Sequence, residues 1–166
     1  MKDLLGDIFH LDASPSYQLY RIARLIRLDI KRLFQSLETV ITPEQWLLLV
    51  RLNEQDGQSQ VELSDKFFKD PPSITRMVDA LVKQRFVVRV SDTKDRRRFS
   101  IYLTHDGQNF IEKTQPLVVE KRRHVFREFS SSDIEKFISY LNLIENSILD
   151  QERHKAMTPV SGEVSL

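Results

Sequence analysis

The fold is decided by residues 59–107, which read SQVELSDKFFKDPPSITRMVDALVKQRFVVRVSDTKDRRRFSIYLTHDG. The first half of this stretch contains two short helix patterns separated by a tight turn, and the second half contains two strand patterns. From Lys66 to Thr104, ten Lys and Arg residues stand against four Asp residues, which gives this window a net charge of +6. The whole chain carries only +1, so the remainder carries −5. Positive charge gathered in one segment is typical of a surface that faces phosphate groups.

Two helix starts are visible in this stretch. Ser59 and Glu62 have the spacing of a capping box, which predicts a short helix to about Phe68. Asp70 is followed directly by proline, and this pair predicts a second helix to about Gln84. In the second helix the apolar residues share one face and the polar residues point away from it. Two such helices joined by a turn make a helix-turn-helix.

A β-hairpin is predicted directly after the second helix. Residues 86–90 are β-branched and apolar, and residues 99–103 alternate with period two. The polar and basic residues 92–98 between them form the predicted tip. A helix-turn-helix followed by such a hairpin is a winged helix-turn-helix. The predicted fold class is therefore mainly α with a small β-hairpin wing.

Long helices are predicted on both sides of this region. A helix starts at Ser14 and Pro15, and a shorter one starts at a capping box that opens with Thr42. After the hairpin, a helix capped by Thr104 runs to about Phe129 with a kink at Pro116, and a capping box at Ser132 and Glu135 starts a last helix to about Glu152. The predicted organisation is an arm (1–13), a winged-helix domain (14–153) with dimerisation helices (14–40 and 105–153) and a DNA-binding lobe (42–104), and a disordered tail (154–166).

The outer helices present more apolar surface than one small winged helix is able to cover. In the first helix, apolar residues repeat in steps of four and three over three heptads, beside a second apolar line. We interpret one of these faces as a dimer interface, and packing within one chain is the alternative. The predicted dimerisation residues are Leu19, Ile26, Ile30, Leu33, Ile138, Leu141 and Ile148.

The composition limits the kinds of site that the chain can build. With no Cys, a thiolate metal site and a disulfide framework are excluded, and the four His residues are far apart in sequence without ligand spacing. We find no order of Ser, His and Asp and no phosphate-binding glycine loop that would support catalysis. The prediction is a cytoplasmic protein that is not an enzyme, with no metal, no cofactor and no membrane partner.

Residues 92–107 resemble the signature of the MarR-type transcriptional regulators, which combines an Asp-Pro-x-Asp-x-Arg wing tip with a strand ending in Leu-Thr-x-x-Gly. Residues 73–81 resemble the recognition helix of this family, and the helix order resembles the family domain over residues 14–153. Two positions depart from the pattern, because Thr93 replaces the usual Pro and Arg85 replaces the Gly between recognition helix and wing.

The resemblance implies a homodimer that binds pseudo-palindromic double-stranded DNA, represses transcription and is released by a small apolar or phenolic effector. It also implies that Ser73, Thr75 and Arg76 approach the major groove and that Arg97, oriented by Asp95, enters the minor groove. Arginine suits both contacts because its planar fork is able to bind a base edge or a narrow, negatively charged groove. The cations that would contact phosphates are Lys83, Lys94, Arg96 and Arg98.

Several of these residues have an alternative role. Tyr20, Phe34, Trp46 and Phe110 form the predicted ligand pocket, and core packing is the alternative for each. Ser73 and Thr75 stand near a helix start, where small polar residues often serve only as caps. An alternative function of a different class is a winged-helix protein–protein interaction module without sequence-specific DNA binding, whose basic wing meets an acidic partner.

Overall fold

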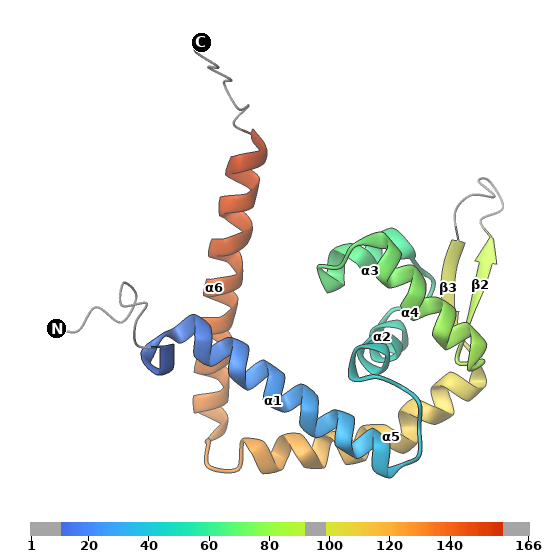
Figure 1. The fold of residues 1–166 in the computed structure, drawn as a ribbon, viewed down its shortest axis with the longest axis horizontal. Helices are drawn as coiled ribbons and strands as arrows, with labels where there is room; N and C mark the ends of the chain where they lie inside the picture. The colour runs from blue at the N-terminus through green and yellow to red at the C-terminus, as the bar shows by residue number, and fades with distance from the viewer. Residues whose placement is uncertain (1–10, 92–98, 158–166) are drawn as a thin grey trace. The chain divides into compact units, whose positions relative to one another are not determined.

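The structure is a computed structural model that describes residues 11–91 and 99–157, except for the side chains of residues 152 and 154–157. The contacts divide the chain after Lys121 into two compact units. Along the chain (Figure 1) the elements are η1 (Leu11–Ala13), α1 (Pro15–Ser36), α2 (Pro43–Glu54), β1 (Gln58–Ser59), α3 (Gln60–Phe67), α4 (Pro71–Lys83), β2 (Val87–Ser91), β3 (Phe99–Leu103), α5 (His105–Val125) and α6 (Ser131–Met157).

The predicted fold class is confirmed in the first unit. Helices α3 and α4 form the helix-turn-helix, and β2 and β3 form the hairpin that follows it. The capping box at Ser59 and Glu62 is present in full, and the Asp70 carboxylate accepts a hydrogen bond from the backbone N–H of Ser73 (3.1 Å). These caps satisfy backbone N–H groups that a helix start leaves without a partner, so the predicted boundaries of both helices are correct to within a residue.

The sheet contains one strand more than predicted. The two-residue strand β1 pairs antiparallel with β3, which gives the strand order β1-β3-β2. The chain enters β1 through Gly57, whose φ of +73° favours glycine and whose N–H donates to the carbonyl of Ile101 (3.0 Å). The ring of Tyr102 lies against this turn, so a Cβ at residue 57 would stand only 2.9 Å from it. A two-residue strand has no alternation for a sequence pattern to detect.

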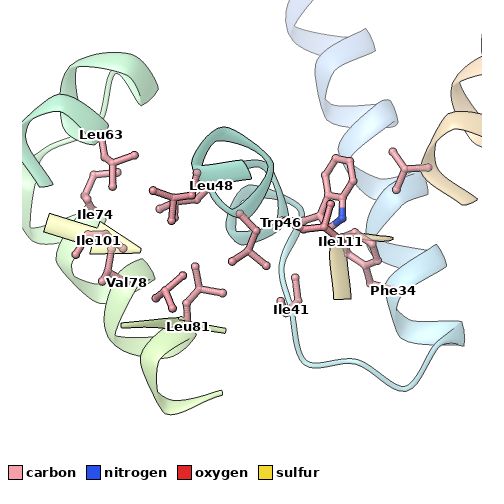
Figure 2. Close-up of a cluster of buried hydrophobic side chains, with 14 of the residues drawn as sticks. Phe34, Ile41, Trp46, Leu48, Leu63, Ile74, Val78, Leu81, Ile101 and Ile111 are labelled. Carbon is pink, nitrogen blue, oxygen red and sulfur yellow. The ribbon is translucent and has the colours of Figure 1, made fainter. Parts of the chain in front are cut away.

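One hydrophobic core fills the first unit. Figure 2 shows Leu63, Ile74, Val78, Leu81 and Ile101 gathered on one side of Leu48, and Phe34, Trp46 and Ile111 on the other side. Helix α2 is therefore the central element, since it packs on the helix-turn-helix and on the long helices at once. The indole Nε1–H of Trp46 donates to Thr114 Oγ1 (2.9 Å), so the polar atom of this buried ring has a partner.

A threonine and a glycine join the hairpin to α5. The predicted cap Thr104 is confirmed, because its Oγ1 accepts a hydrogen bond from the backbone N–H of Gly107 (3.0 Å) and donates one to the carbonyl of Arg85 (2.6 Å). A Cβ on Gly107 would stand only 2.2 Å from the carbonyl oxygen of Phe86. This close approach explains why a glycine occupies the first turn of α5.

Three of the predicted boundaries in the C-terminal part are wrong. Helix α5 ends at Val125 instead of Phe129, although it continues through Pro116 as expected. The start of α6 is capped by Ser130 and Asp133, two residues before the predicted box, because a run of serines offers more than one frame with cap spacing. Helix α6 extends to Met157, so residues 154–157 belong to this helix and not to the predicted tail. Residues 158–166 lie outside the described part of the chain.

Candidate nucleic-acid interface

Helix α4 has two chemically different faces. Ile74, Val78 and Leu81 are completely buried in the core of the first unit, so their side chains fix the rotation of the helix. The opposite face leaves Arg76 and Lys83 exposed. Figure 1 shows α4 beside both α3 and β2, and these two elements contact it, as does α2. The core therefore presents the polar face of this helix outward.

A chain of hydrogen bonds runs along the first turn of α4 and ends at Arg76. The Arg76 Nη2 donates to Ser73 Oγ (2.9 Å). Hydrogen bonds from Ser73, first from its hydroxyl and then from its backbone N–H, hold the pKa of the Asp70 carboxyl below its ordinary value. Ser73 thus serves the cap and the arginine together. The guanidinium is held near the helix N-terminus, and its hydrogen bond within the described part of the chain uses only Nη2.

Thr75 lies on the exposed face and is linked to both α3 and its own helix. Its hydroxyl donates to the carbonyl of Pro71 (2.9 Å) and accepts a hydrogen bond from Gln60 Nε2 (3.3 Å). Gln60 is the first residue of α3, so the turn between the helices brings residues fifteen positions apart together. Sequence reasoning missed Gln60, because only the helix-turn-helix geometry places it beside α4.

An acidic residue also lies on the exposed face of α4. Asp79 forms an ion pair with Arg89 of β2, in which Nη1 stands 2.6 Å from Oδ1. The sequence window counted Arg89 among its ten cations, but the structure shows that its charge is matched at short range. Asp79 is equally neutralised, so it does not stand on this face as an isolated negative charge.

The predicted wing residues Lys94, Asp95, Arg96, Arg97 and Arg98 lie outside the described residues. The structure describes the two strands that flank them. Val88 pairs with Tyr102 and Ser91 pairs with Phe99, so the hairpin register is continuous to the last described residues on both sides. The roles of the five residues stay predictions.

Three of the four residues of the predicted ligand pocket belong to the hydrophobic core or pack against it, and Tyr20 does not. Phe34 and Trp46 are buried in the core with ring centroids 6.2 Å apart. Phe110 packs against Phe86 (4.8 Å), and Tyr20 is exposed. For Phe34 and Trp46 the observed positions agree with the alternative role of core packing.

The predicted dimerisation residues divide into two groups. Ile30 is buried and Leu33 packs against the core of its own chain. Ile26, Ile138 and Ile148 are exposed, and Leu19 and Leu141 are half-buried. The apolar surface left uncovered therefore lies on the first part of α1 and along α6.

The described residues also limit other kinds of site. In residues 11–91 and 99–157 no group of three or more His, Asp or Glu side chains is arranged to hold a metal ion. Over the same residues, every helix is too short or too polar to cross a membrane.

Known proteins share both the local sequence and the fold. Residues 41–99 match the model of the MarR family, from α2 to the start of β3. A crystal structure of MarR is 25% identical with a TM-score of 0.71, over 84% of this chain and 94% of that chain. A MarR transcriptional regulator from Methanosarcina mazei Go1 is 25% identical with a TM-score of 0.71, over 80% of this chain and 95% of that chain.

A third structure extends the likeness in fold to a DNA complex. The S. aureus MepR–DNA complex is 22% identical with a TM-score of 0.73, over 80% of this chain and 97% of that chain. The family match covers the helix-turn-helix and the first hairpin strand, β2, and the shared fold covers most of the chain. The predicted resemblance to the MarR-type regulators is therefore confirmed, in local sequence over residues 41–99 and in fold over most of the chain.

Proposed function

We propose that this chain is a transcriptional regulator of MarR type, a homodimer that binds a pseudo-palindromic operator, represses transcription and is released by a small apolar or phenolic ligand. The observation that carries the DNA-binding part is the exposed face of α4. There Arg76 is held by Ser73 while the opposite face of the helix is locked in the core. The solved complex of MepR with DNA, which has the same fold, supports this part of the proposal.

The recognition helix enters the major groove, whose width accepts an α-helix. Arg76 contacts a guanine edge or a phosphate through its planar fork, and Ser73 fixes its direction. Thr75 approaches the base edges, and Lys83 contacts a phosphate from the last turn.

The wing enters the neighbouring minor groove. This step is supported by the charge of residues 92–98, which contain Lys94, Arg96, Arg97 and Arg98 against two Asp. Arg97 reads the narrow groove while Asp95 orients it, and the other cations contact phosphates. The strands β2 and β3 are the base from which this segment extends.

Two copies of the chain place two copies of α4 on one face of the duplex. The recognition helices then stand about one helical turn apart, ~34 Å, and the half-sites have the same spacing. The uncovered apolar residues of α1 and α6 supply the interface between the copies.

The test is selection of bound duplexes from a random library by the purified protein. We expect a palindrome with the stated spacing, bound at least ~10³-fold more tightly than random sequence. Affinity should fall by several decades over a modest rise in salt concentration, because several phosphate contacts release counterions. A weak, salt-independent interaction without a recovered sequence would contradict the proposal and favour the protein–protein module.

Arg76→Ala tests the observation on which the proposal rests. We expect a loss of ~1–3 kcal/mol in the free energy of DNA binding, with an unchanged free energy of unfolding, because the side chain is exposed. The matched control is Arg123→Ala, which removes an exposed cation from α5. Equal affinities for the parent and for Arg76→Ala would remove α4 from the interface.

The ligand part has its own test. A ligand weakens DNA binding only by the difference between its affinities for the free and the DNA-bound arrangements. Titration of a panel of phenolic compounds into the operator complex should identify one that lowers operator affinity about fivefold or more. Unchanged operator affinity across the panel would contradict release by such a ligand while leaving DNA binding intact.

A further inference from the structure

Strand β2 and helix α4 are joined by one side chain. Arg89 lies in the middle of β2, opposite Ile101 of β3. Its guanidinium contacts α4 at two successive turns. Nη1 stands 2.6 Å from Asp79 Oδ1, and Nη2 donates to the carbonyl of Thr75 at 3.5 Å, the outer limit of a hydrogen bond. The strand that leads to the basic tip is thus tied to the helix that carries Arg76.

The position of Arg89 follows from the pleat of the sheet. Val87 and Ile101 are buried on the face of the hairpin that covers the core, and Arg89 stands on the same face by the alternation of the strand. Val88 and Val90 point to the opposite face and are exposed. Arg89 therefore reaches across the edge of the core to α4, where its side chain is 27% exposed and that of Asp79 is 54% exposed.

Stability of the fold is a weak reason for this ion pair. A pair with this much exposure contributes little to the free energy of unfolding, because solvent screens it. Geometry is the stronger reason, since the planar guanidinium has fixed donor directions and bridges two turns of the helix. Asp79 is otherwise unfavourable here, because an unmatched carboxylate on a DNA-facing surface repels phosphate.

We infer that Arg89 and Asp79 are a positioning pair that holds the wing hairpin at a fixed orientation to the recognition helix and thereby sets sequence specificity. The inference rests on the proposed function, because specificity requires that helix and wing reach their two grooves together. Neither residue reads a base. When the pair is broken, helix and wing no longer match the operator at the same time, whereas random duplex, which makes only phosphate contacts, loses nothing.

The test compares affinities for the selected operator and for random duplex. Asp79→Asn keeps the shape of the side chain and removes its charge. We expect the ratio of the two affinities to fall about tenfold, comparable to the effect of one wrong base pair, while random-duplex affinity is equal or higher. Arg89→Gln should lower the ratio similarly. The matched control is Asp150→Asn in α6, which breaks the Arg153–Asp150 ion pair by the same chemical change and should leave the ratio unchanged.

Each other result contradicts the inference. Equal gains for operator and random duplex in Asp79→Asn would reveal a purely electrostatic role. A lowered melting temperature with an unchanged ratio would reveal a purely structural role.

Exchange of the pair is a further test. The double variant Asp79→Arg with Arg89→Asp should restore part of the affinity ratio that either single charge reversal loses.

A measurement without DNA separates this inference from the proposed function. Residual dipolar couplings of backbone N–H groups report the orientation of β2 and β3 relative to α4. We expect this orientation to change or to become averaged in Asp79→Asn and to stay unchanged in Asp150→Asn. Identical couplings in the parent and Asp79→Asn would overturn the positioning role even where DNA binding is confirmed. If the parent protein selects no sequence but the couplings change in Asp79→Asn, the proposed function and the specificity role are overturned. The positioning role of the pair then still holds.

Discussion

Helices α4 and α6 both start with a hydrogen bond between an aspartate and a serine, but their apolar side chains lie in opposite environments. The Asp70 carboxylate accepts a hydrogen bond from the backbone N–H of Ser73 at the start of α4, and the Asp133 carboxylate accepts one from the backbone N–H of Ser130 at the start of α6. In α4 the apolar residues Ile74, Val78 and Leu81 are completely buried. In α6 no described residue is buried, and Ile138, Leu143 and Ile148 are 50%, 64% and 55% exposed.

The difference shows which surface a single chain completes and which it leaves open. The apolar face of α4 is covered by its own core, and its polar face is exposed, where the proposed contact with DNA would form. The apolar face of α6 is not covered by the described chain, and uncovered apolar surface of this extent marks an interface. The proposed homodimer supplies its partner, a second copy of the chain.

The largest expected effect comes from equal truncations in the two helices. Ile74→Ala should lower the free energy of unfolding by about 2–5 kcal/mol at every protein concentration, because it opens a cavity in the core of one chain. Ile138→Ala removes the same atoms from an exposed position of α6. Its effect should grow as the protein concentration is raised, because this side chain would be buried in the proposed dimer. Urea denaturation at two protein concentrations measures the free energy of unfolding of both variants. If both variants lost the same free energy of unfolding at both protein concentrations, the two helices would not differ in the way proposed.

A charge on α6 tests the dimer more directly. Ile148→Asp should weaken the dimer by about 2 kcal/mol, roughly thirtyfold in Kd, because an unpaired charge would enter an apolar interface. Sedimentation equilibrium measures the Kd, and the nearby exposed change Asn146→Asp is the control. The corresponding change in α1, Leu33→Asp, is less informative, since Leu33 packs against the core of its own chain. If Ile148→Asp had the same dimer Kd as the parent, this face of α6 would be excluded from the dimer interface.

The same comparison explains what the sequence was able to predict. Caps such as Ser59 with Glu62 and Asp70 with Pro71 act within four residues, so sequence spacing was sufficient to locate them. The two faces of α4 follow from helical periodicity and were also predicted correctly. Strand β1 depends on pairing with β3, more than forty residues away, and the serine run before α6 offers more than one frame for a cap.

The candidate site was predicted only in part, for the same reason. Arg76 was identified as a candidate, and its exposure on α4 is a local property. Its hydrogen bond to Ser73 lies within one helix, whereas the approach of Gln60 to Thr75 requires the turn geometry of the folded pair. Periodicity alone also could not decide how far along α1 the core of its own chain extends, so Ile26 and Ile30 fall in one apolar line although only Ile30 is buried.

The C-terminal end of α4 offers a smaller test of how firmly its own chain holds it. Arg85 occupies the position at which the MarR-type pattern has a glycine, and its φ is +63°. A side chain at such a φ is strained, so Arg85→Gly should raise the free energy of unfolding by about 0.5–1 kcal/mol. Gln84→Gly is the control, because Gln84 has a φ of −84° and glycine only adds disorder to the unfolded chain there. A loss of stability in Arg85→Gly would show that the side chain contributes more than the strain removes.

The smallest effect is the pH dependence of the two caps. Hydrogen bonds from Ser73 and from Ser130, in each case first from the hydroxyl, hold the pKa values of Asp70 and Asp133 below the ordinary value of 3.8. Because the folded-state pKa is lower than the unfolded one, each cap stabilises its helix fully above pH 3.8 and loses this contribution as the pH falls through the folded-state pKa. Carboxyl NMR titration should place both midpoints below 3.8, and Ser73→Ala and Ser130→Ala should each raise only the midpoint of its own partner. Asp70→Asn and Asp133→Asn keep a capping oxygen without a titrating group, so each should flatten the acid dependence of amide exchange in the first turn of its own helix. A midpoint at the ordinary value for one carboxyl would show that the two helices differ at their starts as well as along their faces.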